Sequence, residues 1–208
     1  MSRRPPISAA RLRGGLRGSL RSWLGREEAS LSVEAVLVLP FLIWAFAAMF
    51  AFFDVYRDRA LALKGNYAVA DLLSRETNSI DMTYLRGAEK IYTYLTQADD
   101  SAWIRVTPVR CQRRCDDEAR RVLRRDWSRA TDGKPRLSNS DVNNDFRDLI
   151  PMIARGDRVI MVETFLHYTP PINPVLTGVT ARDIYDISMT RPRFSPQLCW
   201  GNLSCLNE

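Results

Sequence analysis

The feature that most constrains this chain is a run of nineteen residues without a charged side chain, from Ala35 to Phe53. A helix needs about 20 apolar residues to cross the hydrocarbon core of a bilayer, and shorter apolar runs are more typical of buried core helices. Pro40 lies inside the run. Membrane helices tolerate proline because neighbouring groups satisfy the freed carbonyl, so we expect a helix kink at this position. The run therefore predicts a transmembrane helix.

The positive charge is concentrated before this run. The chain of 208 residues has a net charge of +6, and residues 1–28 contain seven arginines but only two acidic residues. Because Lys and Arg close to a span tend to stay on the cytoplasmic side, we predict a basic cytoplasmic leader at 1–28, a transmembrane and extended N-terminal helix at 29–76, and a periplasmic α/β domain at 77–208. The predicted location is the bacterial inner membrane, with a single pass. A cleaved secretory signal is the alternative, but it fits a shorter apolar run followed by a small-x-small cleavage site.

The predicted helix continues beyond the span. Ala60, Ala62, Gly65 and Ala68 make one stretch of it slim, and small residues allow another helix to approach closely. Ordinary helix-forming alanine is the alternative interpretation of the same stretch.

The residues after 76 carry the patterns of a helix followed by several strands. From 81 to 98, apolar positions recur at spacings of three and four, and Asp81 is suited to cap this helix. A polar segment at 139–146 marks the start of a second, short helix. The predicted fold class is α+β, in which the long N-terminal transmembrane helix leads into a helix packed on a roughly four-stranded antiparallel sheet. The strands are predicted at 103–111, 120–127, 159–168 and 184–189.

Four cysteines, Cys111, Cys115, Cys199 and Cys205, all follow the predicted span. An even number of cysteines in an oxidising compartment favours disulfides. Zinc is the alternative ligand for these thiolates, but structural zinc sites usually have tighter cysteine spacings. We predict no metal site and the local pairs Cys111 with Cys115 and Cys199 with Cys205, while a crossed pairing stays open.

Glu34 is the polar residue that stands out, because it lies at the start of the apolar run. An ionised carboxylate near hydrocarbon costs free energy unless it is paired or stays at the interface. The simpler interpretation is an acid in the first turn of a helix, which interacts favourably with the helix dipole. The alternative comes from the order of a basic leader, Ala29, Ser30, Glu34 and a long apolar helix, which is the order of a class III, prepilin-type signal. Cleavage after Ala29 would make Ser30 a new N-terminus, whose ammonium could pair with Glu34 of a neighbouring subunit.

The stretch EEASLSVEAVLVLPFLIW resembles the N-terminal region of TadE-like proteins, the pseudopilins of the tight-adherence (Flp) pilus system. Looser similarity follows in DWSRATDG at 126–133, GDRVIMVETFLHYTPP at 156–171 and RPR at 191–193. The family's glycine before the cleavage point is Ala29 here, and its aromatic residue after the glutamate is Ala35. The resemblance implies a pilin-like domain and a membrane-anchored pseudopilin or minor pilin-like component of the pilus assembly machinery. The implied partners are other pilin or pseudopilin subunits, pilus assembly proteins, a prepilin peptidase and the lipid bilayer.

Signals for catalysis and for nucleic-acid binding are weak. The chain has one histidine, His167, and no G-x-S-x-G, H-E-x-x-H or P-loop pattern, so we interpret His167 and Glu163 as solvent-facing strand residues. We predict no enzymatic activity, no cofactor and no nucleic-acid partner. The alternative function is a single-pass periplasmic binding or sensory module without catalytic activity. Acidic residues are interleaved with a group of arginines, which we interpret as a solvated, internally paired face: Arg113, Arg114, Arg120, Arg121, Arg124 and Arg125.

Overall fold

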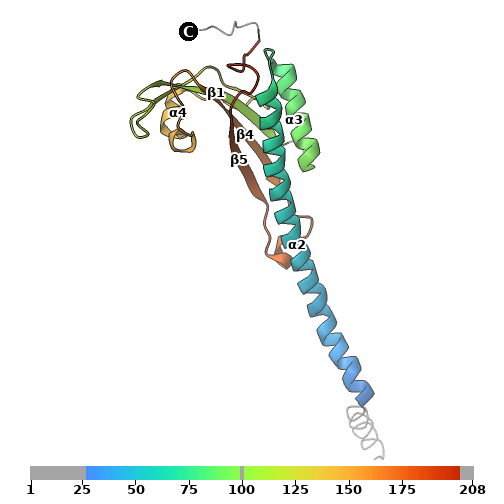
Figure 1. The fold of residues 1–208 in the computed structure, drawn as a ribbon. Coiled ribbons are helices and arrows are strands. Elements are labelled where there is room, and N and C mark those ends of the chain that lie inside the picture. The colour runs from blue at the N-terminus through green and yellow to red at the C-terminus, as the bar shows by residue number, and fades with distance from the viewer. Residues whose placement is uncertain (1–26, 99–100, 202–208) are drawn as a thin grey trace, which may run out of the picture. The chain divides into compact units, whose positions relative to one another are not determined.

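The computed structural model describes residues 27–98 and 101–201. It divides the chain into two compact units, Met1–Phe50 and Ala51–Glu208. One continuous helix, α2 (Glu27–Arg75), belongs to both units, and the second unit adds one further long helix and an antiparallel sheet (Figure 1). The predicted α+β class is therefore confirmed, and the folded unit includes the last part of α2.

The sheet consists of four main strands in the order β2-β1-β4-β5, with a short β3 that also pairs with β1. Every strand pair is antiparallel. The four predicted strands are present with small shifts at their ends, whereas the sequence pattern did not identify β3. The strands are β1 (Trp103–Arg113), β2 (Val122–Arg125), β3 (Arg129–Ala130), β4 (Arg158–Tyr168) and β5 (Arg182–Thr190).

One face of the sheet packs against α2 and α3 (Met82–Thr96). The carboxylate of Asp81 accepts a hydrogen bond from the backbone N–H of Tyr84 at 2.8 Å, so Asp81 caps α3 as the sequence predicts. A Cβ atom at Gly65 would lie 2.9 Å from Cδ2 of Tyr92. Within this chain, the slim stretch of α2 is thus where α3 approaches α2. The helix-side core contains, among others, Val69, Leu73, Leu85, Ile104, Val106, Ile160, Val162 and Ile184.

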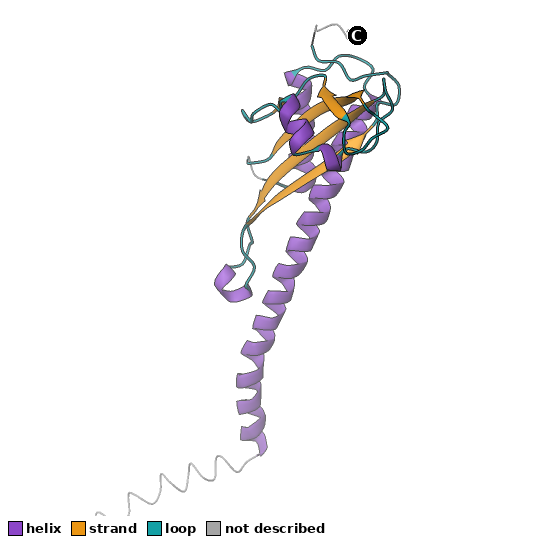
Figure 2. Cartoon of the chain, turned by 90° about the vertical axis from the view of Figure 1, so that its left-hand side faces the viewer, coloured by secondary structure: helices purple, strands orange, loops and turns teal. Residues whose placement is uncertain are grey.

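The opposite face of the sheet is covered in part by α4 (Asn139–Asn144) and the 3-10 turn η2 (Arg147–Leu149) (Figure 2). Ser138 and Asp141 form a reciprocal capping box at the start of α4, where the sequence predicts a helix. A second core lies beneath these elements: Val109, Cys111, Leu123, Leu137, Val142, Ile150, Ile153, Val159 and Met161. Both faces of β1 and β4 are therefore buried along much of their length.

The interpretation of Arg121 as part of a solvated basic face is wrong. Only 1% of Arg121 is exposed, and its guanidinium donates hydrogen bonds to the backbone carbonyls of Arg147, Ile150 and Pro151. Arg120, the residue before it, is exposed, and its Nε lies 3.9 Å from a carboxylate oxygen of Asp117, as that interpretation requires. Arg121 differs because it holds the chain segment after η2 against β2.

A disulfide joins Cys111 and Cys115, which is the local pairing that the sequence favours. It closes the turn that follows β1. Cys199 is also disulfide-bonded. Cys205 lies outside the described residues, so the predicted pairing of Cys199 with Cys205 stays a prediction.

Candidate functional site

The apolar side chains of the first part of α2 are exposed. In the most apolar window of this helix, only 6% of the residues are buried, and α2 is the one helix among the described residues that is long and apolar enough to cross a membrane. A core helix of a soluble protein would instead bury these side chains against other elements. The exposed residues include Val36, Leu37, Leu39, Phe41, Leu42, Ile43, Phe46, Met49, Phe50, Phe52 and Phe53.

The residues of the predicted processing motif lie at the N-terminal end of α2. Glu34 is exposed, and it is the one charged residue between Val33 and Phe53 in the sequence. Ala29 and Ser30 belong to the helical backbone, but their side chains lie outside the described residues. α2 continues through Pro40 without a break in its helical assignment, and the predicted kink stays a prediction.

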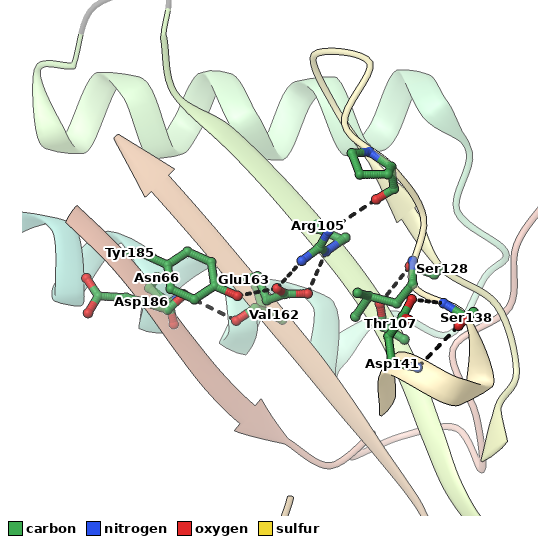
Figure 3. A network of polar contacts seen from close by, with 12 residues as sticks. Asn66, Arg105, Thr107, Ser128, Ser138, Asp141, Val162, Glu163, Tyr185 and Asp186 are labelled. Carbon is green, nitrogen blue, oxygen red and sulfur yellow. Dashed lines mark hydrogen bonds and ion pairs between the residues drawn. The ribbon is translucent and has the colours of Figure 1, made fainter. Parts of the chain in front are cut away.

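Asn66 connects the folded part of α2 to the centre of the sheet. Its side chain is fully buried, and its amide Nδ2 donates to Oγ1 of Thr164 at 2.9 Å. The same nitrogen lies 3.3 Å from the carbonyl oxygen of Asp186 and 3.4 Å from that of Val162 (Figure 3). Twelve residues earlier on α2, Asp54 accepts a hydrogen bond of 2.8 Å from the hydroxyl of Tyr168. These two contacts fix α2 along β4, because a buried donor left without its acceptor is costly.

Asp186 is a buried acid on the helix side of β5. The Arg59 guanidinium lies 3.2 Å from one of its carboxylate oxygens. Burial raises the pKa of Asp186 above its usual value, and the positive charge of Arg59 offsets only part of this effect. The folded chain therefore holds a proton on Asp186 more strongly than the unfolded chain does.

This raised pKa predicts a pH-dependent contribution to stability. The stabilising contribution of Asp186 should fall as pH rises from 3.8 through the raised folded pKa, and it should return as pH falls through the same window. Acidification from neutral pH towards pH ~4 should thus shift the difference in unfolding free energy between wild type and Asp186→Asn in favour of wild type. Urea titrations of the full chain in detergent at several pH values would measure this difference in unfolding free energy. The exposed residue Asp116 supplies the control, Asp116→Asn, and a difference that does not vary with pH would contradict the prediction.

On the other sheet face, Arg105 and Glu163 form a buried ion pair directly across β1 and β4. Both guanidinium edge nitrogens of Arg105 donate to the Glu163 carboxylate, one of them from Nε to Oε2 at 2.7 Å. The hydroxyl of Tyr185 on β5 donates to the same carboxylate (Figure 3). Burial and this hydrogen bond raise the pKa of Tyr185. The arrangement keeps the tyrosine protonated and the carboxylate fully paired.

The interpretation of Glu163 as a solvent-facing acid is wrong, since none of its surface is exposed. Arg105 also donates to the carbonyl of Pro135 at 3.1 Å, so the segment after β3 covers the ion pair. Trp103 stacks on Phe165 at a ring-centroid distance of 5.5 Å beside it. His167, two residues after Phe165 on β4, is exposed as predicted. Its Nδ1 lies 2.7 Å from the Asp183 carboxylate.

These polar groups are arranged for holding the domain together. The two buried carboxylates, Asp186 and Glu163, are each paired with an arginine of the same chain, Arg59 and Arg105 respectively. In residues 27–98 and 101–201, there is no group of three or more His, Cys, Asp or Glu side chains that could hold a metal ion. Among the described residues, the surface that is unusually apolar for its exposure is the first part of α2. No family model, curated protein or solved structure matches this chain.

Proposed function

We propose that this chain is a single-pass protein of the bacterial inner membrane and a structural, pilin-like component of a tight-adherence (Flp) pilus assembly machine. The observation that carries the proposal is the exposed apolar part of α2 with Glu34 at its entrance. A helix of this kind is stable when lipid or other apolar helices surround it. The basic residues before Glu34 favour a cytoplasmic N-terminus, which puts the domain in the periplasm.

The domain supports a structural role because its sheet is bonded to the part of α2 that follows Phe50. Asn66 and Asp54 bond to side chains of β4, and Ala51, Ala62 and Val69 are buried in the helix-side core. Because α2 continues from the apolar run into this domain, a subunit whose helix packs beside other membrane helices would bring its domain into the assembly. Helix packing that positions an attached domain is what we expect of a subunit that forms a fibre or initiates its assembly.

Glu34 is the residue to which we assign the pairing role. After cleavage following Ala29, the ammonium of Ser30 would be the new N-terminus, and the Glu34 carboxylate of a neighbouring subunit is its partner in this proposal. Such a pair would set the register of adjacent helices, because an unpaired charge near hydrocarbon is costly. The partners are other pilin or pseudopilin subunits, and the processing enzyme is a prepilin peptidase.

The experiment that tests this function compares surface pili and surface adhesion in cells with and without the chain. Deletion should remove pili, and the wild-type chain carrying a periplasm-active reporter at its C-terminus should restore them with an active reporter. The matched control replaces residues 35–50 by an unrelated apolar span of equal length, which keeps the anchor and the folded unit from Ala51 onward. This control should reach normal levels in the membrane fraction without restoring pili.

Three outcomes of this experiment would contradict the proposal. Normal piliation after deletion would remove the assembly role. A reporter active only in the cytosol would reverse the topology. Full restoration by the unrelated span would reduce the helix to a generic anchor, as expected of a periplasmic binding or sensory module.

A further inference from the structure

The direction of β4 relative to α2 shows which end of the sheet lies nearest the apolar run. Asn66 on α2 bonds to Thr164 near the middle of β4, whereas Asp54 bonds to Tyr168 at its end. β4 therefore runs along α2 towards the N-terminal part of that helix. Asp54 is also the first charged residue after the apolar run Ala35 to Phe53. The end of β4 thus lies level with the point where the apolar run ends.

The chain between β4 and β5 continues beyond this level. Residues 169–181 form the connecting loop, which contains the short helix α5 (Pro174–Thr177) beyond the ends of both strands (Figures 1 and 2). Val179, at the end of the loop, is buried in the same core as Ala51. Val179 and Phe52 also line one cavity of about 380 Å³. The loop is therefore packed beside the last residues of the apolar run.

The tip of this loop is apolar and exposed. Between Thr169 and Ala181 there is no charged side chain. Val175 is 90% exposed and Leu176 is 58% exposed. The tip has its own capping contacts, since Asn173 accepts a hydrogen bond from the N–H of Val175 and Gly178 ends α5 at φ 72°. Two adjacent aliphatic side chains exposed at a loop tip gain free energy when another apolar phase covers them.

We propose that the β4–β5 loop is a second membrane contact, in which Val175 and Leu176 enter the boundary between headgroups and acyl chains. The proposal rests on the proposed function, because it requires residues 35–53 to cross the bilayer. The bilayer is the occupant that the structure favours, since Val179 of the loop lies beside Phe52 at the end of the apolar run. Arg182, exposed at the start of β5, follows the loop and can bind lipid phosphate. Tyr56 on α2 is 72% exposed, and tyrosine is enriched at membrane–water interfaces.

A photocrosslinking experiment tests this contact on the full chain reconstituted in phospholipid vesicles that contain an alkyne-tagged phospholipid. A photoreactive phenylalanine derivative is placed singly at Val175, at Phe46 in the apolar run, and at Phe194. Phe46 and Phe194 are both exposed. Arg193 bonds to Ser74 of α2, so Phe194 lies roughly 30 Å along the helix from Asp54 at 1.5 Å per residue. It serves as the distal control.

The expected result is tagged-lipid adduct at positions 46 and 175 and only background at 194. Adduct at 46 without adduct at 175 would overturn the loop contact while leaving the span intact. A crosslink from 175 to a second protein copy in place of lipid would do the same. Absence of adduct at 46 would overturn the membrane span itself and the loop contact with it. Equal labelling at 175 and 194 would also contradict the proposal.

Discussion

Replacing Glu163 by alanine is expected to lower the free energy of unfolding by about 3–5 kcal/mol, the typical cost of leaving one charge of a buried pair without its partner. Glu163 is fully buried and bonds to both Arg105 and Tyr185. Its removal leaves the Arg105 guanidinium in a site that is only 10% exposed at the side chain. Urea unfolding of the full chain in detergent, followed by tryptophan fluorescence, would measure the loss.

A double variant tests whether the loss of stability comes from the unpaired charge or from the lost side-chain volume. Arg105→Met with Glu163→Leu removes both charges and keeps apolar volume, so it should lose less stability than Glu163→Ala alone. If Glu163→Ala lowers the free energy of unfolding by less than about 1 kcal/mol, the pair contributes no more than an exposed salt bridge. That result would contradict the prediction. A double variant as unstable as the sum of its single variants would contradict the pairing.

Glu34→Gln is expected to abolish or strongly reduce surface pili while leaving the protein level in the membrane fraction unchanged. Glutamine keeps the size and hydrogen-bonding ability of the side chain but removes the charge that we assign to pairing with the Ser30 ammonium. Membrane insertion should not suffer, because a carboxylate moved towards hydrocarbon costs up to about 2.5–3.5 kcal/mol and the amide avoids that cost. The measurement is pilus formation and surface adhesion in cells whose only copy carries the variant.

Two controls sharpen this result. Glu118→Gln removes another exposed acid, this one in the folded domain, and should leave pili normal. Glu34→Asp keeps the charge on a shorter side chain and should retain more pili than Glu34→Gln. Normal piliation in Glu34→Gln at normal protein level would instead leave Glu34 as an ordinary acid in the first turn of a helix.

Local sequence patterns predicted the elements of the fold well. The spacing of apolar residues located α3, and Asp81 marked its start. Runs of β-branched and aromatic residues located the four main strands. These signals are local, so they survive without knowledge of which elements pack together.

The errors arose where burial depends on distant parts of the chain. Strand alternation indicated that Glu163 faces solvent, but α4, η2 and the segment after β3 cover that side of the sheet. A register that places Arg105 opposite Glu163 would have revealed the pair, and such a register is not visible in either strand alone. Arg121 was misjudged for the same reason, because its carbonyl partners lie in residues 147–151. Asn66 and Asp186 were missed as a helix-to-sheet contact, since they meet only in the folded domain.

The most direct test of the proposed function is the N-terminal sequence of the mature protein from native membranes, with and without the prepilin peptidase. We expect a protein that begins at Ser30 in cells with the peptidase and retains the basic leader in cells without it. Both forms should stay in the membrane, because the apolar part of α2 is present in each. A mature N-terminus after Phe53 would identify the apolar run as a cleaved secretory signal, and an identical N-terminus in both cells would contradict processing as a pilin-like subunit.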